Sequence, residues 1–271
     1  MDDPHWYQAN IAFPDWDQAE RLALDHLVPL LRAAEQDGVL TAWFFIRKRP
    51  CWRVRYQTTA ARDRLEDRLD ALAARQHIDG WTRTVYEPEI HAFGGAASMA
   101  AAHRLFHLDS SHLLDYLQHT GPSGRRREVS VMLCSILMRS AGADWYEQGD
   151  VWARVAEHRG TPAPDGVPDT FRAAVRRLIS VDAEGQMSGR GPLARAAGWS
   201  DAYSAAGREL AALAAAGTLH RGVRDVMAHH VIFAWNRLGL PYAAQAALAA
   251  AAKAAVFGPD CAEQQAQQGE R

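Results

Sequence analysis

The first third of the sequence alternates two hydrophobic periodicities, and this alternation constrains the fold more than any other feature. Runs rich in β-branched and aromatic residues predict strands, and runs with leucines three or four residues apart predict helices. Strands are expected at 5–13, 41–47, 51–59 and 81–87, and helices at 18–36 and 63–75. The order strand-helix-strand-strand-helix-strand is that of a ferredoxin-like unit, with two helices on one face of a four-stranded antiparallel sheet.

After Gly95 the pattern becomes helical. Helices are expected at 97–118, 126–140, 146–158, 170–179, 202–215, 223–238 and 242–257. The segment 182–192 has no periodic pattern and is expected to be a mobile loop. The sequence therefore predicts an α+β protein with a ferredoxin-like subdomain (1–95), a helical part packed against it (96–258) and a disordered polar tail (259–271).

Composition excludes several classes of protein. The chain has 271 residues, a formal net charge of -2 and no long basic block, which argues against a nucleic-acid-binding protein. Its three cysteines, Cys51, Cys134 and Cys261, lack metal-site spacing and are expected to be reduced thiols. The N-terminus does not resemble a signal peptide, and no stretch is apolar enough to span a bilayer. We therefore expect a cytoplasmic globular protein without membrane contact.

The stretch 85–111, VYEPEIHAFGGAASMAAAHRLFHLDSS, collects many side chains that could do chemistry. Its start has the composition of a strand, which Pro88 should end because proline lacks a backbone donor. Gly94-Gly95 allows a tight turn, and the helix that follows is expected to close at residues 109–111. Two carboxylates, three histidines and two serines would then gather at one junction. A well-capped junction with solvated acids explains the same residues.

Arg53 and Arg55 alternate with apolar residues in the predicted strand WRVRY. A period of two places both guanidinium groups on one face of the sheet. They could together bind a carboxylate or peptide carbonyl groups. A solvated outer face would give the same pattern.

Two later segments also carry candidate groups. In 144–152, DWYEQGDVW, Glu147 and Asp150 lie among aromatic residues at a helix start, where a carboxylate could carry protons or simply cap the helix. His229 and His230 are adjacent on a predicted helix and point about 100° apart, so at most one faces a given cleft. No metal-ligand spacing, Walker loop, Rossmann fingerprint or nucleophile elbow is found, so the sequence predicts neither a metal nor an organic cofactor.

Five ordered motifs carry a family resemblance: WFFIR–WRVRY, YEPEIHAFGG, LFHLDSS, DWYEQGDVW and HHVIFAWNRLGL. In order and spacing they resemble the thiopeptide-type bacteriocin biosynthesis domain, which is related to the C-terminal, glutamate-eliminating domain of class I lantibiotic dehydratases. The likeness extends from His5 to Leu240. It leaves no room for a glutamylating domain and implies a stand-alone member of the family.

The resemblance implies one of two reactions. Some stand-alone members eliminate glutamate from glutamylated Ser or Thr, and others, the pyridine synthases, join two dehydroalanines in a formal aza-[4+2] cycloaddition and expel the leader peptide. Eliminating relatives carry an arginine in an ERYGG-like motif and a histidine in an HMHCNR-like motif, where this chain has Ala92 and Ala234. These departures favour cycloaddition. Arg53 and Arg55 match the eliminating pattern and keep elimination open, and a non-catalytic leader-peptide-binding module is a third alternative.

Cycloaddition needs a positioned substrate and groups that move protons. In the light of the resemblance, the residues expected to act as proton carriers or hydrogen-bond donors are Tyr86, Ser110, Tyr146, Glu147 and His230. The residues expected to bind substrate are Arg53, Arg55, His91, Phe93, Trp145, Phe233, Trp235, Asn236 and Arg237, with the tryptophans and Phe233 stacking on a thiazole-rich core.

The implied partner is a ribosomal precursor peptide that carries a leader, azoles and dehydroalanines. Its leader is expected to contact the N-terminal α+β subdomain through Arg53 and Arg55, and the helical part is expected to form the active-site cleft. No nucleic acid and no membrane are expected as partners, and a homodimer is left open.

Overall fold

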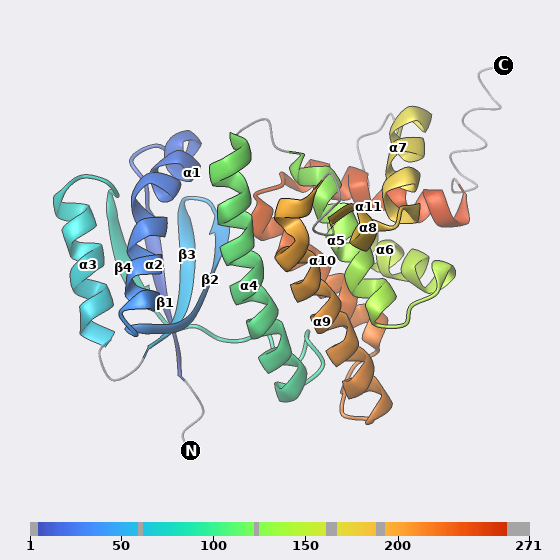
Figure 1. Cartoon of the computed structure of the whole chain (residues 1–271), viewed down its shortest axis with the longest axis horizontal. Coiled ribbons are helices and arrows are strands. Elements are labelled where there is room, and N and C mark those ends of the chain that lie inside the picture. Colours follow the sequence, from blue (N-terminus) through green and yellow to red (C-terminus); the bar gives the residue numbers. More distant parts are fainter. Residues whose placement is uncertain (1–4, 59–61, 122–124, 161–166, 188–192, 259–271) are drawn as a thin grey trace. The chain divides into compact units, whose positions relative to one another are not determined.

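The computed structural model describes residues 5–58, 62–121, 125–160, 167–187 and 193–258 (Figure 1). The chain forms two compact units, one comprising Met1–Pro88 and His103–Gly124 and the other Glu89–Ala102 and Arg125–Arg271. Helix α4 (Ala96–Thr120) begins in the second unit and continues in the first. The predicted tail, 259–271, and its Cys261 lie outside the described residues. The two described cysteines, Cys51 and Cys134, are not joined in a disulfide. No described helix is both long and apolar enough to cross a membrane.

The first unit contains an antiparallel four-stranded sheet with strand order β2-β3-β1-β4. The strands are β1 (Trp6–Ala12), β2 (Leu40–Lys48), β3 (Cys51–Thr58) and β4 (Gly80–Thr84). A helical segment joins β1 to β2 and consists of η1 (Trp16–Gln18), α1 (Ala19–Leu22), the π-helical turn η2 (Ala23–Leu27) and α2 (Val28–Gln36); α3 (Arg62–Ala74) joins β3 to β4. This topology confirms the predicted ferredoxin-like unit.

Both helical connections cover the same face of the sheet. Trp43 Nε1 on β2 donates to Glu35 of α2 (3.3 Å), and Trp81 Nε1 on β4 donates to Asp70 of α3 (2.8 Å). Between these strands the apolar layer is continued by buried residues such as Ile11, which lies opposite both Trp52 and Trp81. The opposite face of the sheet carries the polar residues described below.

The outer edge of β2 is closed by side chains of α4, which runs beside it (Figure 1). His107 Nδ1 lies 3.0 Å from Trp43 O and 3.3 Å from Trp43 N, and Phe45 N donates to Ser110 Oγ (3.4 Å). An open strand edge exposes such backbone groups to foreign strands. Here Ser110 accepts from Phe45 N, and His107 Nδ1 either accepts from Trp43 N or donates to Trp43 O, depending on its tautomer.

The helix predicted at 97–118 is observed as α4, whereas two other predictions for this region were wrong. Residues 109–111 do not close α4, which continues to Thr120, because Asp109 and Ser110 are buried in tertiary packing. The strand predicted at 81–87 ends at Thr84, because the chain leaves the sheet there and Val85 is 84% exposed. The predicted junction of strand, turn and helix is therefore replaced by an extended segment, 85–89, and a turn, 90–94.

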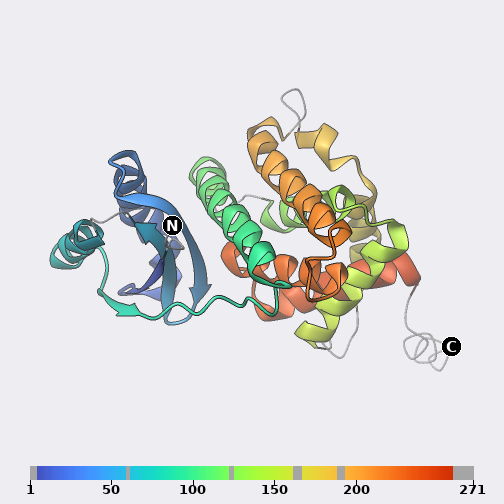
Figure 2. The same ribbon diagram turned by 90° about the horizontal axis from the view of Figure 1, so that it is seen from below.

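The second unit is helical (Figure 2). Its helices are α5 (Arg126–Ser140), α6 (Trp145–Arg159), α7 (Asp169–Ser180), α8 (Ala183–Met187), the 3-10 turn η4 (Ala194–Ala196), α9 (Ala197–Ala215), α10 (Val223–Leu238) and α11 (Tyr242–Phe257). The bounds of α5, α10 and α11 are those predicted. The helix α9 begins earlier than the predicted residue 202. The predicted mobile loop 182–192 instead contains α8, and its residues 188–192 lie outside the described part of the chain.

Helices α5 and α9 approach closely at Gly207. A Cβ atom added to Gly207 would collide with the carbonyl oxygen of Leu137 and lie 2.7 Å from Ser140 Cβ. Both helices are largely buried at this crossing, so neither can move aside without loss of packing.

We expect Gly207→Ala to lower the free energy of unfolding by about 1–3 kcal/mol, because overpacking strains a close helix contact. Thermal and urea unfolding would measure the loss. Ala205→Ser, at an exposed position of the same helix, is the matched control and should stay within about 0.5 kcal/mol. A Gly207→Ala variant as stable as this control would contradict the close packing.

Candidate active site

A buried cluster in the first unit joins an arginine, a tyrosine and a histidine. Arg55 lies on β3, Tyr86 on the segment after β4, and His103 on α4. Tyr86 Oη and His103 Nε2 are hydrogen-bonded at 2.9 Å, and the Arg55 guanidinium lies over the Tyr86 ring at 4.6 Å from its centroid. The structure thus brings together two residues predicted for the site, Arg55 and Tyr86, and adds His103. We refer to these three residues as the Arg55–Tyr86–His103 cluster.

Arg55 is only 5% exposed and is held by polar residues of the neighbouring strands. Its Nε donates to Gln8 Oε1 (2.8 Å). Gln8 Nε2 in turn donates to Asn10 Oδ1 (3.0 Å) and Thr84 Oγ1 (2.9 Å), so the amide is fixed with its oxygen toward the guanidinium. This chain of hydrogen bonds determines where the arginine points.

Aromatic rings enclose the imidazole of His103. Trp6 lies 4.5 Å from it between ring centroids and Phe44 lies 5.8 Å away. Phe44 also contacts Phe106 (5.2 Å) and lies under the Arg55 guanidinium at 5.4 Å. The polar groups therefore lie in apolar surroundings, where hydrogen bonds and charges act more strongly than in water.

Burial and, second, the nearby charge of Arg55 lower the pKa of His103 from 6.5 to about 4. Both causes disfavour the imidazolium form. At neutral pH the hydrogen-bonded pair of Tyr86 and His103 consequently contains a neutral imidazole, which has one ring nitrogen free of a proton and one that carries it. Such a pair can accept a proton at one atom and donate one at another.

A second group of rings lies in the helical unit, around Phe93. Its ring centroid is 5.0 Å from that of His230, 5.1 Å from that of Phe233 and 6.1 Å from that of His229. Burial, then Arg237 and then His229 lower the pKa of His230 to about 3. Three residues predicted for the site, Phe93, His230 and Phe233, are therefore neighbours, and all three are buried.

Gly94 and Gly95 make this position of Phe93 possible. Their φ angles are +80° and +117°, in the region that side chains other than glycine rarely adopt. His220 N donates to Gly94 O (2.9 Å), and a Cβ on Gly95 would lie 3.3 Å from His220 Nδ1. Glycine at these two positions therefore allows both the positive φ angles and the close packing against His220.

The residues predicted at the start of α6 cap this helix and contact neighbouring helices. Glu147 and the N-cap Asp144 form a capping box, and Glu147 also forms an ion pair with Arg224 of α10 (3.1 Å). Tyr146 is 65% exposed and stacks on Phe257. Trp145 is half-buried. These contacts explain the segment structurally, and its catalytic role stays a prediction.

The residues predicted near the end of α10 lie in the core of the helical unit. Trp235 is fully buried and stacks on Trp152 at 6.0 Å, and Arg237 is also fully buried. Asn236 Oδ1 accepts a hydrogen bond from Gln245 of α11 (3.2 Å). Their positions give Trp235 a packing role; contact of these residues with substrate is a prediction.

Three predicted residues remain. Ser110 belongs to the closed edge of β2 and has no solvent-exposed surface. Arg53 shares its sheet face with Arg55 and is half-buried, and His91 is exposed in the turn 90–94. None of the three lies in the contacts that define the Arg55–Tyr86–His103 cluster.

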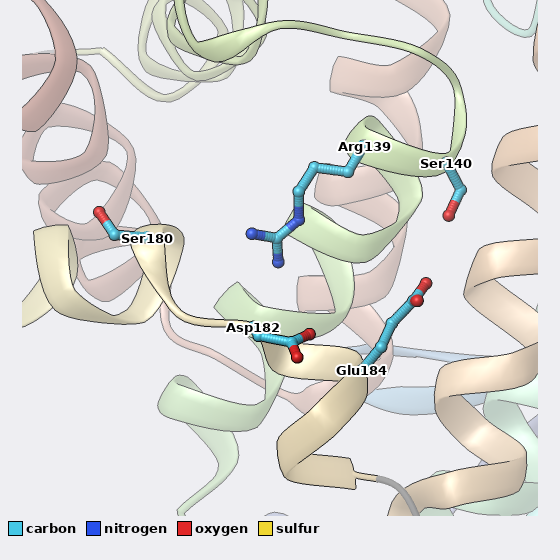
Figure 3. Close-up of a pocket in the computed structure, with 5 residues that line it drawn as sticks. All are labelled: Arg139, Ser140, Ser180, Asp182 and Glu184. Atoms are coloured by element: carbon cyan, nitrogen blue, oxygen red, sulfur yellow. The ribbon is translucent and has the colours of Figure 1, made fainter.

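A separate pocket of about 440 Å³ lies in the helical unit and is lined by Arg139, Ser140, Ser180, Asp182 and Glu184 (Figure 3). Arg139 Nη1 donates to Val181 O (3.0 Å), near the end of α7, and Asp182 Oδ1 accepts from Gly185 N (3.0 Å) at the start of α8. Two of the five side chains thus form hydrogen bonds with backbone groups at helix ends. No predicted site residue lines this pocket.

Sequence reasoning missed His103 and Gln8. His103 appeared only as one of several histidines in the stretch 85–111, and the register that places Gln8 opposite Arg55 is tertiary information. The only sequence signal for Gln8 was a polar residue in the interior of a predicted strand.

We expect the free energy of unfolding to fall as the pH is lowered from about 6.5 to about 4, because the unfolded state then binds a proton that folded His103 does not. This contribution is fully present above pH 6.5. One group contributes at most about 1.4 kcal/mol per pH unit. Urea unfolding at several pH values would show a shallower slope for His103→Gln than for the wild type. Equal slopes would contradict the lowered pKa.

The comparisons with known proteins agree with this fold. The model of the family described as "Lantibiotic biosynthesis dehydratase C-term" matches residues 6–256. The tRNA-dependent lantibiotic dehydratase MibB from Microbispora sp. 107891 has a similar structure, with a TM-score of 0.67 and 19% identity over 99% of this chain. This chain spans 29% of the length of MibB. TsrL matches with a TM-score of 0.63 and 16% identity over 94% of this chain and 98% of its own.

At sequence identities of 19% and 16%, the structural matches to MibB and TsrL show a shared fold and nothing further. A search of the curated proteins found no match. The family model covers nearly the whole length of the two units. The chain therefore belongs to the lantibiotic biosynthesis dehydratase C-terminal family.

Proposed function

We propose that this protein matures a ribosomally made precursor peptide by joining two of its dehydroalanines in a formal aza-[4+2] cycloaddition. The amide that precedes one dehydroalanine becomes an imidate, so that its C=N bond and the C=C bond of this residue form a 2-azadiene. The two terminal carbons of the azadiene then form two C–C bonds with the C=C bond of the second dehydroalanine and close a six-membered ring. Loss of water and of the leader, as an amide, leaves a pyridine-type ring. No oxidant is consumed in this sequence. Membership of the family supports a role in peptide maturation.

The observation that carries the proposal is the hydrogen bond between Tyr86 and the neutral His103. Formation of the imidate moves a proton from the amide nitrogen to its oxygen, and loss of water protonates the leaving hydroxyl group. A neutral pair of phenol and imidazole can take part in both steps, because each partner can donate and accept. Arg55, over the phenol ring, favours transient negative charge on Tyr86.

The aromatic surroundings of the pair support the same proposal. Cycloaddition within one peptide depends mainly on holding its two reacting ends together, which can lower a barrier by several kcal/mol. The half-buried Trp6 lies against His103 and offers a flat apolar surface, and the fully buried Phe44 contacts the same imidazole from the sheet. The Phe93, His230 and Phe233 group is a second region that we assign to substrate contact.

The positions of Ala92 and Ala234 favour cycloaddition over glutamate elimination. Ala234 is fully buried within α10, and Ala92 is half-buried next to Phe93. A methyl group at either position can neither pair with a glutamyl carboxylate nor remove an α-proton. Elimination stays the second candidate, because Arg53 and Arg55 retain the pattern of eliminating relatives.

Two substrates separate the candidates. We expect a peptide with two dehydroalanines to lose the mass of its leader and of water when it is incubated with the protein. A second peptide, glutamylated at Ser, should keep its mass. Mass spectrometry would follow both. Release of glutamate from the second peptide, with the first unchanged, would reverse the assignment.

Two variants test the proton-transfer pair. Tyr86→Phe and His103→Gln should each lower turnover of the dehydroalanine peptide by about 10²-fold or more while leaving peptide binding intact. The controls are Tyr242→Phe, at an exposed tyrosine, and His119→Gln, at an exposed histidine of the same helix as His103. Unchanged turnover in both cluster variants, with the fold intact by circular dichroism, would remove the pair from the mechanism.

A further inference from the structure

The two edges of the sheet differ in how they are completed. The outer edge of β2 is closed, because His107 and Ser110 of α4 occupy backbone groups of Trp43 and Phe45. At the other end of the sheet, β4 pairs with β1 on its inner side, and no described strand lies beyond it. Thr82 and Arg83, in the interior of β4, are exposed.

An open strand edge presents alternating N–H and C=O groups and therefore recognises an extended main chain. We propose that the outer edge of β4, Gly80–Thr84, is the docking strand for the leader segment of the precursor peptide. The leader would add to the sheet as a fifth strand. This proposal rests on the proposed function, because that function requires a peptide substrate.

A leader peptide fits this edge better than a second copy of the chain does. The strand β4 has 5 residues, whereas a stable interface between folded proteins involves roughly 20–30 residues on each side. Pairing through β4 alone is therefore too small to hold two copies together. A peptide substrate needs less, because its core is bound a second time at the reacting groups and the two contacts reinforce each other.

The position of β4 in the first unit also favours the substrate peptide. Its last residue, Thr84, accepts a hydrogen bond from Gln8, which holds Arg55, and Tyr86 follows two residues later. The strand β4 is thus connected to the Arg55–Tyr86–His103 cluster through Gln8 and through the chain that follows it. On the helix-covered face, Arg83 is hydrogen-bonded to Glu66 (2.9 Å) and Trp81 to Asp70. Because these side chains already contact α3, we assign recognition of the leader to the main chain of β4.

Hydrogen exchange on the full chain tests the site directly. The probe is the synthetic leader half of the precursor used in the turnover assay. Backbone amides of 80–84 should exchange more slowly with the leader bound, while those of β2 should not change, because that edge is already closed. Protection confined to other segments, with 80–84 unchanged, would overturn the proposal.

Proline variants give a second test. Neighbouring residues of a strand point their N–H groups to opposite sides. One of the variants Thr82→Pro and Arg83→Pro therefore removes an N–H group that points away from the sheet. The other variant removes an N–H group that is hydrogen-bonded to β1. The variant that keeps the wild-type melting temperature should bind fluorescent leader about tenfold more weakly, or worse. Arg83→Ala, which keeps the main chain, is the control and should bind normally.

The outcomes separate this inference from the proposed function. A folded proline variant with unchanged leader affinity overturns the docking strand, whatever the reaction is. If leader binding depends on β4 while the dehydroalanine peptide is not cyclised, the docking strand is supported and the cycloaddition is wrong. If both variants unfold, the exchange measurement on the wild-type chain decides.

Discussion

The burial of the Arg55 guanidinium is the constraint on which the polar face of the sheet depends. A buried cation is costly unless hydrogen bonds and polarisable surfaces replace the water it loses. Here Gln8 accepts from its Nε, and the rings of Tyr86 and Phe44 lie beneath its charge. The same charge and the same burial keep His103 neutral. The hydrogen bond to Gln8 thus orients the arginine, and burial together with the arginine's charge keeps the histidine beside it neutral.

Burial of histidine recurs in the helical unit. His230 is 3% exposed and its pKa falls to about 3, with burial as the first cause. Its neighbour His229 is also shifted downward in pKa, mainly by burial, and lies 5.0 Å from the exposed His158 between ring centroids. Each unit thus holds a neutral histidine against aromatic rings, and a neutral imidazole has no charge with which to bind an anion.

Family membership and chemistry rest on different observations. The matched family model and the folds of MibB and TsrL establish what kind of domain this is. They do not distinguish ring closure from elimination, because that choice depends on a few side chains within a shared fold. Alanines at 92 and 234 and the contacts among Arg55, Tyr86 and His103 are the features of this chain that bear on the choice.

The sequence by itself determined the order of the strands and helices and several helix ends. Periodicity and end signals act over a few residues, so α10, with Gly239 (φ +72°) after its last turn, and α11, which follows Pro241, could be located correctly. Tertiary structure decided where β4 ends and that Gln8 meets Arg55, 47 residues away. These outcomes depend on strand register and on packing between distant segments, which local patterns do not encode.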